Sequence, residues 1–289
     1  MSIQWYPGHM TAAKKKAEEA MEFHDLIVEV LDARIPGSST NPLIASIRSE
    51  RQRPHLKVLN KADLADPKIT EQWIKYFNSQ PKTNAISLSA KQTKDIKEVI
   101  LNCEKLAPNR GTSVKPLRIL IMGVPNVGKS TIINALKNKK IAKVGNVPAV
   151  TKMQQRIEIN NRIIMTDTPG MMWPKITNEL DGIFLAASHS IGINAYDEIE
   201  TAIILSEILS ERYPELLIAY YGFKIPLPSD EKFLEDIAKT RNFIIKGGKA
   251  NLLKAAVTFI NDYRNGLIGR VSLESPTSRK LMLDNFQTE

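Results

Sequence analysis

The chain is poor in cysteine, in aromatic residues and in long apolar runs. Its single cysteine, Cys103, excludes a disulfide framework within the chain and is expected to be a buried core residue. No apolar run approaches the ~20 residues that span a bilayer. The start, MSIQWYPGHMTAAKKK, places its basic cluster after a short mixed segment, the reverse of a secretory signal peptide. These absences favour a soluble intracellular protein.

Acidic residues are scarce in the first part of the chain. The net charge is +9, but residues 1–180 hold 28 Lys and Arg against 16 Asp and Glu, whereas residues 181–289 hold 12 against 15. A basic excess of this size suggests a polyanionic partner, most often nucleic acid. A solvated basic surface is the alternative, and charge alone leaves the two open.

Apolar strands alternate with helical segments in the first part of the chain. The 43% hydrophobic content of the 289 residues is sufficient for a sizeable core. Strand and helix patterns in alternation predict an α/β fold, with a mostly parallel sheet and helices on both faces. Strands are expected at residues 25–34, 55–60, 84–90 and 118–124, followed by a strand pair around Asn160 and Asn161.

The pattern changes at about residue 178. Apolar spacing predicts amphipathic helices over residues 196–212, 228–239 and 251–264, with no convincing strand among them. Residues 1–180 are therefore expected to form the α/β domain, and residues 181–289 a small all-α domain. The last fifteen residues are expected to be a frayed tail.

Residues 123–131, GVPNVGKST, fit the phosphate-loop pattern GxxxxGK[ST] without departure. They follow one expected strand and open a helix, whose N-terminal N–H groups attract phosphate. Lys129 is expected to reach the β and γ phosphates of a nucleotide, and Ser130 to bind Mg²⁺. The predicted nucleotide contacts in this loop are Asn126, Val127, Gly128, Lys129, Ser130 and Thr131.

A second phosphate-side motif, Asp167-Thr168-Pro169-Gly170, closes an expected strand and fits DxxG. Asp167 is expected to hold Mg²⁺ through water, and the N–H of Gly170 to contact the γ-phosphate. Thr151 lies between this motif and the phosphate loop and is the candidate switch threonine. The predicted metal site therefore combines Ser130, Thr151 and Asp167.

The segment Asn60-Lys61-Ala62-Asp63 follows an expected strand and fits NKxD, the pattern that reads guanine. The Asp63 carboxylate would accept hydrogen bonds from N1–H and from the exocyclic amine, a pair of donors that adenine does not offer. A site built for that pairing rejects adenine, because its buried carboxylate would stay unpaired. Lys61 is expected to pack along the base.

A second guanine loop is indicated by SLSAK, in which Ser89 and the backbone of Ala90 would contact the base. Along the chain the motifs run NKxD, SAK, phosphate loop, switch threonine and DxxG. An ordinary GTPase begins with the phosphate loop, so this is the same cyclic order cut at a different point. The sheet can still gather every loop at the carboxyl ends of its strands, and permutation is tolerated because domain termini often lie close together.

With these motifs the chain resembles the circularly permuted GTPases, most closely those that serve ribosome assembly. The resemblance covers the whole chain and is most specific in residues 1–175. It is carried by WYPGHM (5–10), LDARIP (31–36), Asn41-Pro42, LNKAD, GVPNVGKST, the frame at 145–152 and DTPGMMWPK (167–175). It implies a circularly permuted P-loop GTPase domain that hydrolyses GTP to GDP, followed by a helical domain that grips ribosomal RNA.

The resemblance also implies a catalytic residue and a further ion. Many GTPases place a water-orienting glutamine directly after DxxG, but here that position is Met171. The family assigns this work to the histidine of PGHM, His9, although the residue taken alone could equally be structural. Related GTPases hold K⁺ with an asparagine at the position of Asn126. One departure is Ala149, which stands where the family usually has glycine ahead of the switch threonine.

The partners implied by the resemblance are a precursor of the large ribosomal subunit and its rRNA, with hydrolysis activated by that particle. Neither a membrane nor DNA is expected as a partner, and the chain is expected to be a monomer in a bacterial cytoplasm. Two other functions stay open. GTP would merely gate an RNA-binding module in the first, and the chain would serve tRNA modification in the second.

Overall fold

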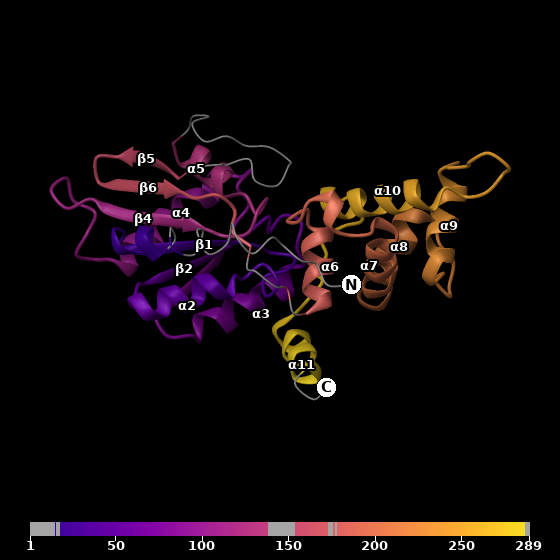
Figure 1. The fold of residues 1–289 in the computed structure, drawn as a ribbon, viewed down its shortest axis with the longest axis horizontal. Coiled ribbons are helices and arrows are strands. Elements are labelled where there is room, and N and C mark those ends of the chain that lie inside the picture. The colour runs from indigo at the N-terminus through magenta and orange to yellow at the C-terminus, as the bar shows by residue number, and fades with distance from the viewer. Residues whose placement is uncertain (1–14, 16–17, 138–153, 173–175, 177, 287–289) are drawn as a thin grey trace.

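The computed structural model describes residues 15, 18–137, 154–172, 176 and 178–286. A six-stranded sheet in the order β3-β2-β1-β4-β6-β5 forms the centre of its first part (Figure 1). All neighbouring strands pair in parallel except β5 and β6, which form an antiparallel hairpin. The strands are β1 (Leu26–Asp32), β2 (His55–Asn60), β3 (Thr83–Ser87), β4 (Leu117–Met122), β5 (Gln155–Asn160) and β6 (Ile163–Asp167).

The central strands are buried because helices cover both faces of the sheet. Every residue of β1, β2 and β6 is buried, as expected for parallel strands that lie between two helical layers. The covering helices are α2 (Pro42–Arg51), α3 (Pro67–Asn78), α4 (Thr93–Leu106) and α5 (Lys129–Lys137). The α/β fold predicted from the sequence is confirmed.

Helices alone follow β6 in the described part of the chain. They are α6 (Glu179–Ala187), the short 3-10 helix η1 (Ile193–Ala195), α7 (Glu198–Arg212), α8 (Pro214–Tyr221), α9 (Asp230–Thr240), α10 (Leu252–Asn265) and α11 (Pro276–Phe286). The three predicted helices correspond to α7, α9 and α10. The expectation of a frayed C-terminal tail is wrong over α11, where Arg279 forms ion pairs with Asp181 and Glu274.

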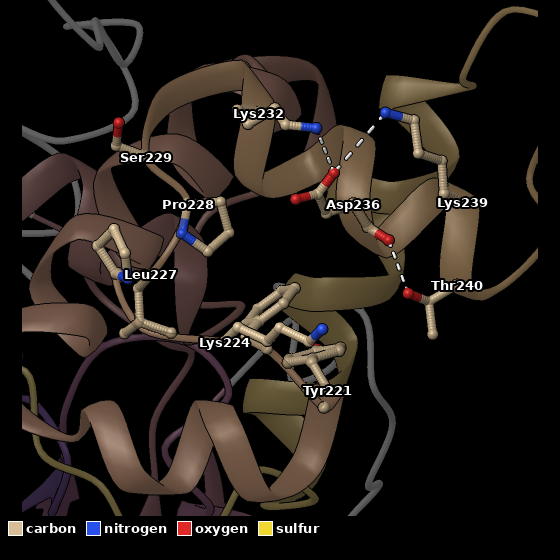
Figure 2. Close-up of a pocket in the computed structure, with 12 residues that line it drawn as sticks. Tyr221, Lys224, Leu227, Pro228, Ser229, Lys232, Asp236, Lys239 and Thr240 are labelled. Carbon is tan, nitrogen blue, oxygen red and sulfur yellow. Dashed lines mark hydrogen bonds and ion pairs between the residues drawn. The ribbon is translucent and has the colours of Figure 1, made fainter.

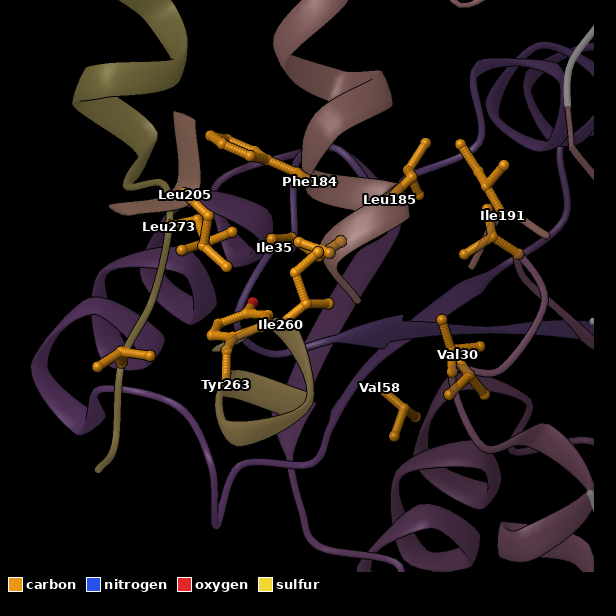
Figure 3. Close-up of a cluster of buried hydrophobic side chains, with 14 of the residues drawn as sticks. Val30, Ile35, Val58, Phe184, Leu185, Ile191, Leu205, Ile260, Tyr263 and Leu273 are labelled. Atoms are coloured by element: carbon orange, nitrogen blue, oxygen red, sulfur yellow. The ribbon is translucent and has the colours of Figure 1, made fainter. Parts of the chain in front are cut away.

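A continuous hydrophobic cluster joins the sheet to the helices that follow it (Figure 3). Val30 and Val58 contribute from the strands, Leu185 from α6, and Ile260 and Tyr263 from α10; all five are buried. The two parts of the chain therefore share a core.

Cys103 lies in the same cluster and is buried, as predicted. Burial raises the pKa of its thiol, which keeps it protonated and unreactive. Separately, none of the helices in the described part of the chain has both the length and the apolar character needed to cross a bilayer.

Candidate nucleotide-binding site

Five parallel strands end at one edge of the sheet, and the predicted motifs begin there. The strands end at Asp32, Asn60, Ser87, Met122 and Asp167. Parallel strands place their carboxyl ends together, and ligands of α/β sheets bind at that edge. The NKxD, SAK, phosphate-loop and DxxG segments are thus brought to one place, although the chain order of an ordinary GTPase is not kept.

Asn60 connects three of these segments. Its side-chain Nδ2 donates to the backbone oxygen of Val127 over 2.7 Å, and its Oδ1 accepts from the backbone N of Ala90 over 3.0 Å. Gly128 adopts a φ of +101°, and a Cβ at this position would lie 2.2 Å from the Asn60 Nδ2. The phosphate loop therefore needs glycine here both for its backbone conformation and for the close approach of Asn60.

Lys61 is held in place by a buried carboxylate at the end of β1. Its Nζ donates to Asp32 Oδ2 over 2.7 Å, and the Arg34 guanidinium pairs with the same oxygen over 2.9 Å. Burial by itself would raise the pKa of Asp32, but the charges of Arg34 and Lys61 outweigh it and hold that pKa well below its usual range. Burial lowers the pKa of Lys61, and Asp32 opposes that shift.

The contacts of Asp32 with Lys61 and Arg34 were not predicted from the sequence, in which Asp32 and Arg34 were only part of the family resemblance. The available signal was a charged residue at the end of a fully buried strand. By contrast Asp63, the predicted guanine reader, stays partly open, with 25% of its side chain exposed and Lys91 Nζ 3.9 Å from its Oδ2. Its carboxylate is therefore accessible to a ligand.

Lys129 of the phosphate loop is buried and bonded to the loop itself. Its Nζ donates to the backbone oxygens of Gly123 and Val124 over 3.0 and 2.9 Å. Burial lowers the pKa of Lys129 to about 8, although the nearby Asp167 carboxylate opposes that shift. A phosphate group bound here would give the Lys129 ammonium an anionic hydrogen-bond partner in place of neutral backbone oxygens.

The two predicted Mg²⁺ ligands that the structure describes lie together. Ser130 Oγ donates to Asp167 Oδ2 over 2.9 Å, so a hydroxyl and a carboxylate face one position. Gly170 packs against the phosphate loop, and a Cβ there would come 2.7 Å from Pro125 Cα. Met171 N donates to the backbone oxygen of Gly123 over 3.1 Å, which closes the DxxG segment onto the loop.

Other kinds of metal site are not seen in the described residues, which contain no group of three or more His, Cys, Asp or Glu placed to hold an ion. A nucleotide-bound Mg²⁺ does not need such a group, because phosphate and water supply most of its ligands. His9 and Thr151, the predicted catalytic and switch residues, lie outside the described residues.

His189 is a neighbour of the phosphate loop that sequence reasoning missed, since it belongs to no motif. Asn126 Nδ2 donates to the backbone oxygen of His189 over 2.7 Å. Burial lowers the pKa of the His189 ring, and the positive charges of Arg264 and Lys61 lower it further. The segment after α6 therefore contacts the candidate site directly.

Comparisons with known proteins place this geometry in a family. A model of 50S ribosome-binding GTPases matches residues 118–216, beginning at the strand that enters the phosphate loop. The sequence is 37% identical to the ribosome biogenesis GTPase A of Bacillus cereus over 284 residues, which are 96% of this chain and 95% of that protein. The chain belongs to the ribosome biogenesis GTPase A family. As a member, it is a GTPase.

Solved structures agree with this assignment. The GNP-bound YlqF from T. maritima is 27% identical to this GTPase and superimposes with a TM-score of 0.66, covering 92% of this chain and 99% of its own. A GDP-bound structure of YlqF gives a TM-score of 0.67 at 26% identity, covering 91% of this chain and 99% of its own. The likeness extends over both the sheet and the helices that follow it.

This GTPase also has a cavity of about 580 Å³ away from the nucleotide site, between the loop after α8 and helix α9 (Figure 2). Lys232 Nζ lies 2.5 Å from Asp236 Oδ1, and Lys239 Nζ lies 3.7 Å from the same oxygen. The cavity is lined in part by Tyr221 and Pro226. With Lys224 the cavity is lined by three lysines and one aspartate, so its lining carries a net positive charge that Asp236 only partly offsets.

Proposed function

We propose that this GTPase acts late in the assembly of the large ribosomal subunit, and that rRNA of the precursor particle stimulates its hydrolysis of GTP. The observation that carries the proposal is that Asn60 is bonded to both the phosphate loop and the SAK loop, which supports a single guanine-nucleotide site built from separate motifs. The proposal is supported by relatives that are named ribosome biogenesis GTPase A. Action as a monomer in the bacterial cytoplasm is part of the same proposal.

The nucleotide would bind across the carboxyl edge of the sheet. Asp63 would read the guanine N1–H and amine, with Ser89 and the Ala90 N–H at the far edge of the base. Lys129 would exchange its two backbone oxygens for phosphate oxygens, whose negative charge raises the lysine pKa again. The N–H of Gly170 would contact the γ-phosphate, and the loop contacts would come from Asn126, Val127, Gly128, Ser130 and Thr131.

Mg²⁺ and K⁺ are proposed as the ions of this site. Ser130 and Asp167 present oxygen ligands 2.9 Å apart, a donor set that suits Mg²⁺, and Thr151 would complete it in the triphosphate state. Asn126 already donates its Nδ2 to His189, so it would hold K⁺ through its amide oxygen. Bound cations would offset the charge that develops on the phosphates.

Water activation is assigned to His9 in this proposal. Met171, the residue directly after DxxG, has only a weakly accepting thioether and cannot orient a water molecule as glutamine does. An imidazole brought in by RNA would hold the water in line with the γ-phosphate without itself needing to abstract a proton. Hydrolysis would then be slow until the partner is bound.

The helical part is proposed to contact RNA through the loop between α9 and α10. No Asp or Glu occurs from residue 237 to 261, a stretch with five Lys and Arg in a region of negative net charge. Lys239 and Arg241 face Asp236 and Asp262 within 3.7 Å, whereas Lys246 and Lys249 lie on an exposed loop. These two lysines are therefore suited to phosphate contacts.

The division into residues 1–180 and 181–289 is also a proposal. The boundary at 180 falls inside α6, whose N-cap is Asn178, so residue 178 is a better starting point for the helical domain. The short distance in sequence from Gly170 to this cap would pass movement of the DxxG segment on phosphate loss to the helices. GTP would favour the arrangement that grips rRNA, and hydrolysis would release it.

The test is steady-state GTP hydrolysis in K⁺ buffer with and without purified large ribosomal subunits, for the wild type, His9→Ala and His24→Gln. His24 contacts Thr166 of β6 and serves as the matched control. We expect strong stimulation that His9→Ala loses and His24→Gln keeps. No stimulation by subunits would instead favour a role in tRNA modification. If subunits stimulate GTP hydrolysis but subunit assembly proceeds without that hydrolysis, a GTP-gated RNA-binding module would be favoured.

A further inference from the structure

The guanine loop, residues 60–66, is supported from outside by the C-terminal end of the helical part. Arg270 donates from Nε to the backbone oxygen of Ala65 over 2.9 Å, and from Nη2 to that of Ala62 over 2.8 Å. These two oxygens stand on either side of Asp63. One planar guanidinium therefore fixes the backbone before and after the carboxylate proposed to read guanine.

Neighbouring residues extend this contact along the loop to Asp66. Val271 N donates to the backbone oxygen of Leu64 over 3.0 Å, and Asp66 N donates to Ser272 Oγ over 3.2 Å. Gly266, at φ +71°, lies so close that a Cβ would come 2.6 Å from Leu64 Cδ2. The segment 266–272 thus follows the outer edge of the guanine loop.

The inner edge of the loop is held by the sheet. Ala62 N donates to the backbone oxygen of Leu88 over 3.1 Å, and Lys61 pairs with Asp32. A second connection to the helices exists even here, because Arg34, the other partner of Asp32, donates to the backbone oxygen of Tyr263 over 3.1 Å. Asp63 is therefore placed between a support from the sheet and a support from the C-terminal segment.

We infer that Arg270 is a positioning residue for guanine recognition, through which the helical part of the chain sets the affinity for guanine nucleotides. The inference rests on the proposed role of Asp63. Linkage makes the effect reciprocal: a partner that draws the segment 266–272 away from the guanine loop weakens nucleotide binding, and bound nucleotide opposes that partner by the same factor. Nucleotide affinity therefore depends on whether a partner is bound to the helical part.

The test measures the dissociation constants of GDP, IDP and pyrophosphate by calorimetry, with the full chain and Mg²⁺, for the wild type, Arg270→Ala and Arg270→Lys. IDP lacks the exocyclic amine, so the preference for GDP over IDP reports how well Asp63 is placed. For Arg270→Ala we expect GDP binding to weaken roughly tenfold, within the usual range of coupling between sites. The preference over IDP should shrink, and pyrophosphate binding should stay within about twofold of wild type.

Arg270→Lys keeps a positive charge but cannot hold both oxygens in one plane, so its values should fall between those of wild type and Arg270→Ala. It also carries the test if the alanine variant does not fold. Arg241→Ala is the matched control: this arginine belongs to the helical part, contacts Tyr220 and Asp262, and should leave the preference for GDP over IDP unchanged.

Two kinds of result would overturn the inference, and only one of them would also overturn the proposed guanine site. If Arg270→Ala weakens pyrophosphate as much as GDP, or leaves both unchanged, Arg270 does not position the guanine reader. Asp63→Asn in the same assay tests the site itself, because it should abolish the preference for GDP over IDP. If Asp63→Asn keeps that preference, both the proposed guanine site and this inference are wrong. If Asp63→Asn abolishes the preference while Arg270→Ala leaves it unchanged, only the inference is wrong.

Discussion

Asn60 and Val127 are joined by a hydrogen bond of 2.7 Å between side-chain amide and backbone oxygen, although 67 residues separate them in the chain. The bond connects the guanine loop to the phosphate loop at the edge where β2 and β4 end. It shows how a permuted chain still builds one site. The order of the motifs has changed, but the strands that carry them end at the same edge of the sheet.

Replacing Asn60 by alanine removes both of its bonds and should separate the base reader from the phosphate loop. Each bond contributes about 0.5–1.5 kcal/mol, so we expect GDP affinity to fall about tenfold to a hundredfold. Fluorescent GDP binding at equilibrium measures this. Asn84→Ala is the control, since Asn84 of β3 bonds Asn102 of α4, outside the motif loops, and should change stability only. Equal affinities for Asn60→Ala and wild type would contradict the bridging role.

Nucleotide affinity should fall as pH rises above about 8. The pKa of Lys129 is about 8 here, lowered by burial, so the side chain loses its proton above that pH while the unoccupied loop is folded. Phosphate raises this pKa on binding, so binding takes up a proton, and affinity drops by up to about tenfold per pH unit. Lys129→Arg is the control: the nucleotide still titrates in this variant, but the arginine side chain stays protonated. Parallel pH profiles for the two proteins would refute the prediction.

Arg279→Ala should destabilise the contact between α11 and the rest of the molecule. Arg279 Nη2 lies 3.0 Å from Asp181 Oδ2, and its Nη1 lies 3.3 Å from Glu274 Oε2; both carboxylates are nearly buried. Removing the cation leaves two buried acids, which costs about 3–5 kcal/mol at neutral pH. Urea unfolding measures this loss. Burial already raises the pKa of Glu274, so the loss should shrink towards acidic pH, where protonation relieves the charge. A loss that does not depend on pH would argue against this account.

Charge reversal at Lys246 and Lys249 should weaken association with the large ribosomal subunit. Each phosphate contact releases counterions, so affinity falls as salt rises. Losing two contacts should make the slope of log affinity against log salt less negative by roughly 1.4–1.8. Sedimentation with subunits over a range of KCl concentrations measures the slope. Lys224→Glu is the control, because this lysine lies in the same helical part but lines the cavity near Asp236. If control and test variants lose equal affinity for the subunit, the α9–α10 loop is not part of the RNA-binding surface.

The sequence by itself determined the elements and the motif loops. Apolar runs fixed the strands, since β2 was predicted at its observed bounds of residues 55–60, and glycine and lysine in GVPNVGKST fixed the phosphate loop. These signals are local, because a strand or a phosphate loop is specified by neighbouring residues. Helices α6 and α8 were missed because they are apolar over most of their length and show weak periodicity.

The tertiary structure decided what supports the site. Asp32 beneath Lys61, His189 beside Asn126, and Arg270 beside Ala62 all join residues that are distant in sequence. Asp32 and Lys61 meet because β1 and β2 pair in the sheet, whereas the other two contacts depend on where the helical part folds back on the sheet; neither kind of contact has a periodic pattern along the chain. The same reason explains α11: its sequence is of mixed polarity, and its place comes from the ion pairs of Arg279 with a buried carboxylate on α6.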